Sequence, residues 1–462
     1  MPQQSMALAC DSGGPAKDSR GLTVQAAHDR GASMATTLDQ PSEAAAENAV
    51  ALVHRLARDA RVAQSALARM PAETREHALK LAAQALLRAE DTVLAANARD
   101  VAAGEAGGLS GAMLDRLRLT PQRLAAIAAA VADVAVLPDP TGAVIDRTTR
   151  PNGMVLERVR VPIGVIGIIY ESRPNVTADA AALCVRAGNA VLLRGGSEAV
   201  HSNRAIHAAL IDGLVAGGVP AAAVQFIPTQ DREAVGALLA AAGLIDMIVP
   251  RGGKNLVARV QADARVPVLA HLDGNNHTFV DRSADPAMAA AIVHNAKLRR
   301  TGICGAMETL LIDACYPDPH GLVEPLLAAG CELRGDARAQ AIDPRILPAT
   351  PADWDTEYLD AIASVAVVDG LDAALAHIAA HGSGHTDAII AEDAAVAERF
   401  LAEVDSAIVM HNASSQFADG GEFGLGAEIG IATGRLHARG PVAVEGLTTY
   451  KWLVRGSGQV RP

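Results

Sequence analysis

A chain of 462 residues is long enough to build two or three domains, each around a sizeable hydrophobic core. Half of the residues are hydrophobic but only 2% are aromatic, so the cores must consist of Ala, Val, Leu and Ile, which suits α/β layering. The formal net charge of -12 argues against a general nucleic-acid-binding protein, whose binding surface is a basic domain or a basic stripe. No apolar run approaches the roughly 18 residues that span a bilayer, so we expect a cytoplasmic protein that binds neither nucleic acid nor membrane.

The N-terminal segment, residues 1–41, is rich in Gly, Ser, Ala, Gln and Asp and has no periodic pattern. We therefore expect a disordered extension, in which Met34 is a candidate for the natural start and which lacks the apolar core of a signal peptide. The cysteines are odd in number and irregularly spaced, which predicts neither a disulfide framework nor a metal site: Cys10, Cys184, Cys304, Cys315 and Cys331.

From Ser42 onward the apolar residues recur at helical spacing. Helices are expected at residues 42–60, 71–87 and 91–103 and after Thr120-Pro121, where a capping residue precedes a proline at the first helical position. Between residues 138 and 162 the pattern changes, and Val155–Val161 alternates apolar and charged residues as a half-exposed strand does. This strand and a terminal strand at Leu447–Leu453 would leave exposed edges on a monomer, which predicts self-association.

Short apolar runs separated by helical stretches then predict a parallel sheet covered on both faces, the doubly wound arrangement. Its strands are expected at residues 163–170, 189–193, 224–227, 245–249 and 267–270. Two strand ends carry basic residues and glycines, which can offer positive charge and backbone N–H groups to the phosphates of a nucleotide. They are Arg194, Gly195, Gly196 and Ser197 after one strand, and Arg251, Gly252 and Gly253 after another. The alternative at each place is a glycine that only eases a strand-to-helix turn.

A second α/β unit follows Asp273, with a strand at 277–280, a helix at 285–297, a strand at 308–312 and further strands at 364–368, 387–390 and 406–410. The loop after the helix carries Cys304 between small neighbours, so a substrate can approach its sulfur. Lys297, Arg299 and Arg300 precede it, and their charges would favour the nucleophilic thiolate over the thiol, whose pKa is normally about 8.5. The alternative is a buried structural cysteine.

Together these elements resemble the aldehyde dehydrogenase superfamily, which combines helices, a nucleotide-binding sheet, a second α/β domain with a loop cysteine, and protruding strands. Local sequences from about residue 45 to 455 resemble one branch of it: YESRPNVT, LRGG, IVPRGG, NAK with Cys304 and ETLL, FGLGAE, LHARGP and TTYKW. The resemblance implies two doubly wound α/β domains with a protruding flap of oligomerisation strands. It assigns residues 42–143 and 162–272 to an NADP-binding domain, 273–440 to a catalytic domain, and 144–161 and 441–462 to the flap.

This branch of the superfamily reduces L-glutamyl 5-phosphate with NADPH to glutamate 5-semialdehyde, with release of phosphate, in proline biosynthesis. The resemblance therefore implies that Cys304 attacks the acyl phosphate and forms a thioester, which hydride then reduces. It implies that Ser172 or Asn175 assists the Cys304 N–H in binding the oxyanion. The basic residues expected at the substrate are Arg173, Lys297, Arg299, Arg300 and Arg435. Because the substrate is labile, the kinase that makes it, glutamate 5-kinase, is a candidate contact partner, and we expect the chain to form a dimer or tetramer.

Two other functions stay open on the sequence. A hydrolytic aldehyde dehydrogenase of the same fold would use a glutamate to activate water, and this chain has His271 at the corresponding place. A non-catalytic scaffold would not require Cys304 or the two glycine turns. NADPH rather than NADH is the expected cofactor, because Arg194 and Ser197 stand where NAD-preferring relatives carry an acidic residue near the ribose.

Overall fold

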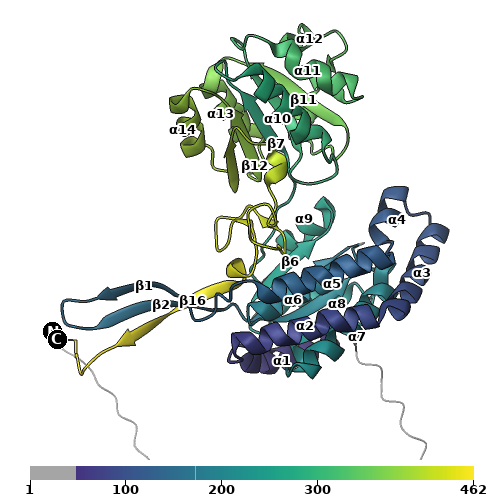
Figure 1. The fold of residues 1–462 in the computed structure, drawn as a ribbon, viewed down its shortest axis with the longest axis vertical. Helices are drawn as coiled ribbons and strands as arrows, with labels where there is room; N and C mark the ends of the chain where they lie inside the picture. Colours follow the sequence, from purple (N-terminus) through teal and green to yellow (C-terminus); the bar gives the residue numbers. More distant parts are fainter. Residues whose placement is uncertain (1–47, 172, 462) are drawn as a thin grey trace, which may run out of the picture. The chain divides into compact units, whose positions relative to one another are not determined.

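The computed structural model describes residues 48–171 and 173–461. The extension expected at residues 1–41, the start of the helix expected from Ser42, and Ser172 lie outside the described residues. The described chain forms two parallel sheets with helices on both faces and a separate antiparallel sheet (Figure 1). The expected α/β class is therefore confirmed. Among the described helices, none is long and apolar enough to cross a membrane.

The first parallel sheet has the strand order β5-β4-β3-β6. Its strands are β3 (Val165–Tyr170), β4 (Ala190–Gly195), β5 (Val224–Phe226) and β6 (Met247–Arg251). Every residue of β3 is buried, because alternate side chains enter the cores on opposite faces of the sheet. Ile166 and Ile168 enter one core, and Val165 and Ile169 enter the other. Burial on both faces explains the continuous apolar run that predicts this strand.

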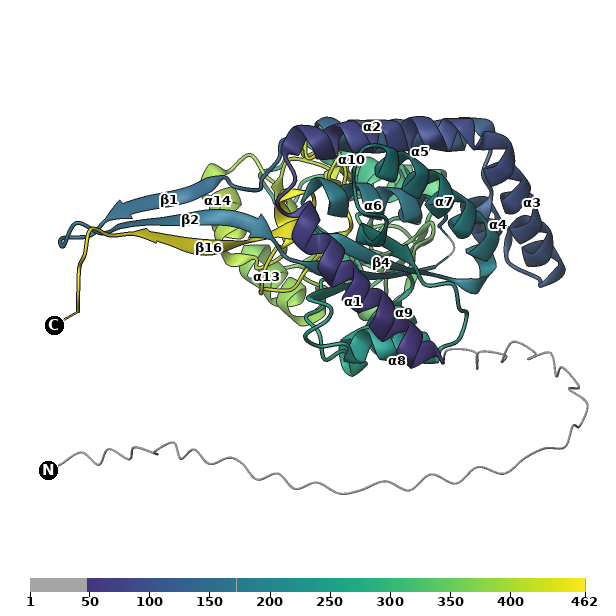
Figure 2. The same ribbon diagram turned by 90° about the horizontal axis from the view of Figure 1, so that it is seen from below.

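Helices cover both faces of this sheet (Figure 2). One core contains side chains of α2 (Ala72–Arg88), α5 (Pro121–Val136), α6 (Asn175–Arg186) and α7 (Val200–Ala216), and the other those of α1 (Ala49–Leu67), α8 (Glu233–Ala240) and α9 (Lys254–Asp263). α7 approaches α2 closely at Gly213, where a Cβ atom would lie 2.4 Å from the Ala82 Cα atom. A residue without a side chain therefore lets these two helices pack at short range.

Two local expectations differ from the structure. The strand expected at residues 267–270 is only an isolated bridge between Val268 and Ile248. Pro267 has no N–H to donate, so its carbonyl oxygen alone bonds to the Ile248 N–H, at 2.8 Å. The second difference is a short helix, α4 (Gly111–Leu117), which follows α3 (Glu90–Ala106) and which the apolar pattern did not indicate.

The second parallel sheet has the strand order β10-β9-β11-β8-β7-β12-β13. Its strands are β7 (Asn276–Val280), β8 (Met307–Asp313), β9 (Glu332–Gly335), β10 (Leu347–Pro348), β11 (Ile362–Val368), β12 (Thr386–Ile390) and β13 (Ile408–His411). Its helices are α10 (Pro286–Leu298), α11 (Pro319–Ala328) and α12 (Ala337–Gln340) on one face, and α13 (Gly370–His381) and α14 (Ala394–Glu403) on the other (Figure 1). The short strands β9 and β10 were not indicated by the sequence pattern.

The antiparallel sheet joins β1 (Val144–Thr149), β2 (Val155–Pro162) and β16 (Thr448–Arg455) in the order β1-β2-β16. β2 pairs with β16 along its whole length, from Pro162 opposite Thr448 to Val155 opposite Arg455. The expectation that β2 leaves an exposed edge is therefore wrong, because β2 is the central strand and the edges belong to β1 and β16. Two further short strands, β14 (Ile431–Ala432) and β15 (Gly440–Pro441), pair with each other.

Candidate active site

The loop that carries Cys304 lies between α10 and β8 and is held by the side chain of Asn276, the first residue of β7. The Asn276 amide donates to the Cys304 carbonyl oxygen at 2.6 Å and to the Ala306 carbonyl oxygen at 2.8 Å. Its side-chain oxygen accepts from the N–H of Thr386, the first residue of β12, at 3.1 Å. Because Asn276 is fully buried, these bonds are shielded from water. One side chain thus joins the cysteine loop to the starts of two strands.

Gly274 supports the same loop from the segment before β7. A Cβ atom on Gly274 would lie 2.2 Å from the Cys304 carbonyl oxygen, so only glycine allows the two backbones to approach this closely. The Gly274 N–H donates to the Glu357 carboxylate at 3.0 Å, which brings a negative charge to the loop. The Cys304 backbone is therefore fixed, while the residue as a whole stays partly exposed to solvent.

The charges around Cys304 differ from those expected. Burial and the charge of Glu428 raise the pKa of the Cys304 thiol to about 11, and the charge of Arg251 opposes this rise. The expectation that Lys297, Arg299 and Arg300 favour the thiolate is therefore wrong: the opposing positive charge comes from Arg251, and the pKa rises rather than falls.

Lys297 forms an ion pair inside the protein. Its Nζ atom lies 2.6 Å from the Glu308 carboxylate, and both side chains are fully buried. Lys297 belongs to α10 and Glu308 to β8, so the pair joins the two elements that flank the cysteine loop. Burial raises the pKa of Glu308, and the charge of Lys297 acts in the opposite direction. Lys297 is therefore committed to Glu308 rather than presented to a substrate anion.

Three arginines from different elements lie around Cys304. Arg251 ends β6, Arg173 precedes α6, and Arg116 belongs to α4. The charges of Arg116 and Arg251 act on Arg173, which also interacts with the charge of Cys304. The Arg116 guanidinium lies 4.0 Å from the position of a Cβ atom on Gly302, within the cysteine loop. Like charges repel, so this grouping suits an anion bound between them.

Two histidine rings lie beside the sulfur. One nitrogen of His271, one nitrogen of His385 and the Cys304 Sγ atom are all within 4.8 Å of one another. The rings meet edge to face, with centroids 4.9 Å apart. His271 Nδ1 lies 2.8 Å from the Ile431 carbonyl oxygen, which can only accept, so Nδ1 carries the proton and Nε2 the lone pair. Burial lowers the pKa of both rings, that of His385 to about 3.

The turn after β4 has polar atoms that fit a nucleotide. Arg194 donates to the carbonyl oxygens of Gly195, at 2.9 Å, and Gln230, at 3.2 Å. Its Nε atom and both polar side-chain atoms of Gln230 are buried and have no partner among the described residues. Buried polar atoms normally have partners, so these fit the hydroxyl or phosphate groups of a bound cofactor. Gly196 and Ser197 lead from this turn into α7.

In the turn after β6, unlike the turn after β4, a carboxylate of the protein itself binds the backbone N–H group. The Gly253 N–H, at the start of α9, donates to the Glu171 carboxylate at 3.0 Å. Glu171 follows β3, and its own N–H donates to the Arg251 carbonyl oxygen at 3.0 Å. A carboxylate therefore takes the place next to Gly252 and Gly253 where we expect a phosphate, and the charge of Arg251 acts on Cys304 instead.

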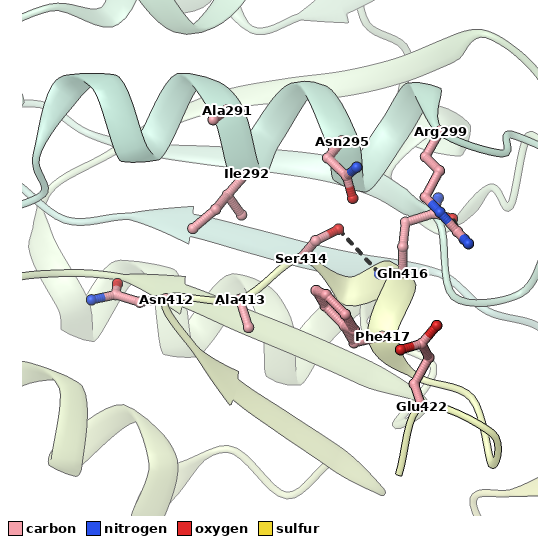
Figure 3. A pocket seen from close by; sticks show the side chains of 10 residues that line it. All are labelled: Ala291, Ile292, Asn295, Arg299, Asn412, Ala413, Ser414, Gln416, Phe417 and Glu422. Carbon is pink, nitrogen blue, oxygen red and sulfur yellow. Dashed lines mark hydrogen bonds between the residues drawn. The ribbon is translucent and has the colours of Figure 1, made fainter. Parts of the chain in front are cut away.

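No contact among the described residues places the other three predicted basic residues, Arg299, Arg300 and Arg435, beside the Cys304 sulfur. Arg299 lines a separate cavity of about 320 Å³, and Figure 3 shows it projecting from α10 toward Gln416. Cys304 is not among the residues that line this cavity. Arg300 is exposed at the end of α10, and Arg435 is exposed and forms an ion pair with Asp405.

The expected second oxyanion donor is not located by these contacts. Asn175 begins α6, and its amide donates to the Asp179 carboxylate one turn later, at 2.8 Å. Ser172 lies outside the described residues. The backbone N–H of Cys304 stays the expected donor on the loop itself.

Sequence reasoning assigned no role to six residues of the site: Arg116, Gln230, Asn276, Glu357, His385 and Glu428. A signal existed for one of them, since Asn276 begins a strand whose residues are all buried. Polar side chains in a buried strand require partners, which predicts a structural or functional role. Arg116 lies on the short helix α4 and the others lie in turns and loops, where neighbours in space cannot be read from neighbours in sequence.

The chain is similar to proteins of one family. A model of the aldehyde dehydrogenase family matches residues 32–334. The gamma-glutamyl phosphate reductase of Novosphingobium aromaticivorans is 79% identical over 417 residues, which cover 90% of this chain and 98% of the relative. That of Sphingopyxis alaskensis is 68% identical over 421 residues, 91% of this chain and 98% of the relative. The crystal structure of gamma-glutamyl phosphate reductase from Thermotoga maritima has a TM-score of 0.87 and 41% identity, and covers 89% of this chain and 100% of that one.

The buried pair of Lys297 and Glu308 generates a stability prediction. Lys297→Met leaves the Glu308 carboxylate buried without its counter-charge, and we expect the free energy of unfolding to fall by about 3–5 kcal/mol. The double variant Lys297→Met/Glu308→Leu removes both charges and should recover most of this loss. Denaturant unfolding measures each difference.

A matched control for this pair lies on α2. Lys80 and Glu76 are also 2.6 Å apart, but both side chains are partly exposed, so Lys80→Met should cost less than about 1 kcal/mol. Equal losses in Lys297→Met and Lys80→Met would contradict the importance of burial for the first pair.

Proposed function

The chain belongs to the aldehyde dehydrogenase family, within which it groups with the gamma-glutamyl phosphate reductases, and we propose that it reduces L-glutamyl 5-phosphate to L-glutamate 5-semialdehyde with release of phosphate, the second step of proline biosynthesis from glutamate. The observation that carries this proposal is Cys304, a partly exposed thiol on a fixed loop with three arginines around it. A nucleophile beside converging guanidinium groups suits an acyl phosphate, which brings an electrophilic carbon and an anion together.

The charges of the site complement those of this substrate. Its phosphate and α-carboxylate suit Arg116, Arg173 and Arg251, because guanidinium groups bind such anions through paired N–H donors. Its α-ammonium suits the carboxylates of Glu357 and Glu428, whose charges act on the Cys304 thiol. Both ends of an amino-acid phosphate thus find opposite charges within one site.

The covalent step follows from the position of the sulfur. The S–H bond breaks and its proton passes to the solvent, Sγ attacks the acyl carbon, the carbon–oxygen bond to phosphate breaks, and phosphate departs with the bonding electrons. The product is a thioester on Cys304. Asn276 and Gly274 position the loop during this exchange, because they hold the Cys304 backbone. When bound, a nicotinamide cofactor supplies the hydride that reduces the thioester.

The cofactor proposed here is NADPH. Its support is the turn after β4, where Arg194 Nε and the Gln230 amide are buried without partners among the described residues. Arg194 offers positive charge to a 2′-phosphate, and Ser197 is exposed beside it. The negative charge of Glu198 acts on Arg194 and weakens its attraction for a 2′-phosphate. A second negative charge at Ser197 should therefore be enough to change the preference between NADPH and NADH.

We expect Ser197→Glu to reduce the preference for NADPH over NADH about tenfold, because a carboxylate repels the 2′-phosphate and accepts from a 2′-hydroxyl. The ratio of kcat/KM for the two cofactors measures the change. Ser197→Gln, of the same size but neutral, should retain the preference. Equal efficiency of the unmodified protein with both cofactors would contradict the proposal.

The reverse reaction tests the function itself. With glutamate 5-semialdehyde and NADP, the protein should form NADPH steadily when inorganic phosphate is present and at most once per site when it is absent, since phosphate must release the thioester. Cys304→Ala should be inactive. Cys315→Ala should be active, because Cys315 is an exposed residue that follows β8 and is not part of the cluster around Cys304.

Steady NADPH formation without phosphate would instead show that water releases the thioester, as in a hydrolytic aldehyde dehydrogenase. His271→Glu is the complementary variant, because it restores the residue that activates water in such enzymes. It should increase phosphate-independent oxidation relative to the unmodified protein.

Self-association is proposed through the antiparallel sheet. β16 is an edge strand, and Tyr450, Trp452 and Val454, alternate residues on one of its faces, are 48%, 55% and 58% exposed. An edge strand with exposed apolar side chains is normally covered, and a second copy of the chain is the occupant that the family resemblance implies.

Light scattering should therefore report a dimer or tetramer at micromolar concentration, and the double variant Trp452→Lys/Val454→Lys should shift it toward the monomer. Val62→Lys is the control, since Val62 is 75% exposed on α1, away from this edge. A monomeric unmodified protein would refute the proposal.

A further inference from the structure

Three side chains of metal-ligating type meet at the nucleophile: His271, Cys304 and His385. They come from the segments before β7, β8 and β12, so their spacing along the chain gives no sign of a shared site. We propose that this cluster binds Zn²⁺ as a thiolate–bis-imidazole site, which reversibly removes Cys304 from catalysis.

The geometry requires only small side-chain movements. Zinc bonds to sulfur at about 2.3 Å and to imidazole nitrogen at about 2.0–2.1 Å, so ligand atoms in a tetrahedral site are about 3.3–3.6 Å apart. The three atoms here lie within 4.8 Å of one another. Movements of about 1 Å therefore close the site, with the fourth position open to water.

The ring nitrogens are available for a metal. His271 donates from Nδ1 to the Ile431 carbonyl oxygen at 2.8 Å, so its Nε2 lone pair is free to coordinate. This is also how metal-bound histidines are usually oriented. His385 is fully buried, its Nδ1 lies 2.8 Å from Thr386 Oγ1, and its Nε2 has no partner among the described residues. A fully buried ring nitrogen without a partner is an independent sign of a ligand.

The surrounding charge suits a divalent cation of this kind. Glu428 and Glu357 act on Cys304 with negative charge and Arg251 with positive charge. The two carboxylates and the thiolate formed on binding offset the positive charges of the three arginines around the sulfur, so Zn²⁺ does not enter a site of net positive charge. Sulfur and imidazole ligands select zinc over magnesium or calcium, which require oxygen ligands.

Binding is an acid–base exchange without oxidation or reduction. The Cys304 S–H bond breaks, its proton passes to the solvent, and Sγ donates an electron pair to the metal. While that bond exists, the sulfur cannot attack an acyl carbon. The metal-binding step is independent of the proposed reaction, whereas the loss of activity rests on the proposed role of Cys304.

Cobalt substitution tests the binding on the full-length protein, because Co²⁺ reports its ligands by absorption. One equivalent of Co²⁺ should give a near-ultraviolet thiolate-to-metal band and the visible bands of tetrahedral Co²⁺, and Zn²⁺ should abolish both by displacement. The thiolate band should vanish in Cys304→Ser and require at least tenfold more Co²⁺ in His385→Gln. No thiolate band at one equivalent, or an unchanged titration in His385→Gln, would overturn the proposal.

Two variants act as controls. Cys315→Ser should retain the band, because Cys315 lies outside the cluster. His320→Ala should also retain it, since His320 belongs to a second group, with Glu324 and Asp343, that contains no sulfur. If His385→Gln fails to fold, X-ray absorption of the zinc-loaded unmodified protein decides. One sulfur and two nitrogen neighbours are expected, and a shell of oxygens alone would refute the site.

The inhibitory role has its own measurement. One equivalent of Zn²⁺ should suppress phosphate-dependent NADPH formation, and EDTA should restore it. Zinc binding without inhibition would overturn the proposed capture of the nucleophile. If the metal-free protein shows no phosphate-dependent turnover, the proposed function fails, while the cobalt spectrum still decides whether the site exists.

Discussion

The site depends on one buried amide. Asn276 donates to the carbonyl oxygens of Cys304 and Ala306 and accepts from the N–H of Thr386, the first residue of β12, so a single side chain sets the distance between the Cys304 backbone and two strands. Aspartate or leucine would have nearly the same size but could not donate to two carbonyl oxygens. The backbone of a reactive cysteine is thereby fixed without any restriction on its sulfur.

Burial, rather than the number of nearby basic residues, decides which charges serve the site. Lys297 is adjacent in sequence to the cysteine loop, yet it forms a buried ion pair with Glu308. Arg116, Arg173 and Arg251 are remote in sequence and act around the loop, where two carboxylates and a desolvated thiol also lie. The result is a cysteine whose charge state responds to what binds beside it, because neighbouring charges shift its balance between thiol and thiolate.

Periodicity was sufficient for strands buried on both faces and for helices that bury one face. β3 is buried on both faces and reads as a continuous apolar run, and Pro121 marks the start of α5 as expected. Where partners lie far apart in sequence, the pattern carried no information. In the sequence, nothing indicates that the Gly253 N–H donates to Glu171 rather than to a phosphate. Likewise, the strand expected at Val268 is reduced to a single bridge, because Pro267 has no N–H to extend the pairing. The nucleophilic role of Cys304 was predicted from the resemblance, since glycine neighbours alone do not separate a reactive cysteine from a structural one.

The antiparallel sheet has a consequence for how the chain is made. Arg160 of β2 and Thr448 of β16 form a hydrogen bond across 288 residues of sequence. During synthesis, almost all of the remaining chain must therefore be made before the third strand can pair with the β1–β2 hairpin. Two-stranded ribbons are marginal in water, and closing so long a loop is slow. Both α/β units can be complete by then, so the three-stranded sheet is the last part of the described chain to be completed.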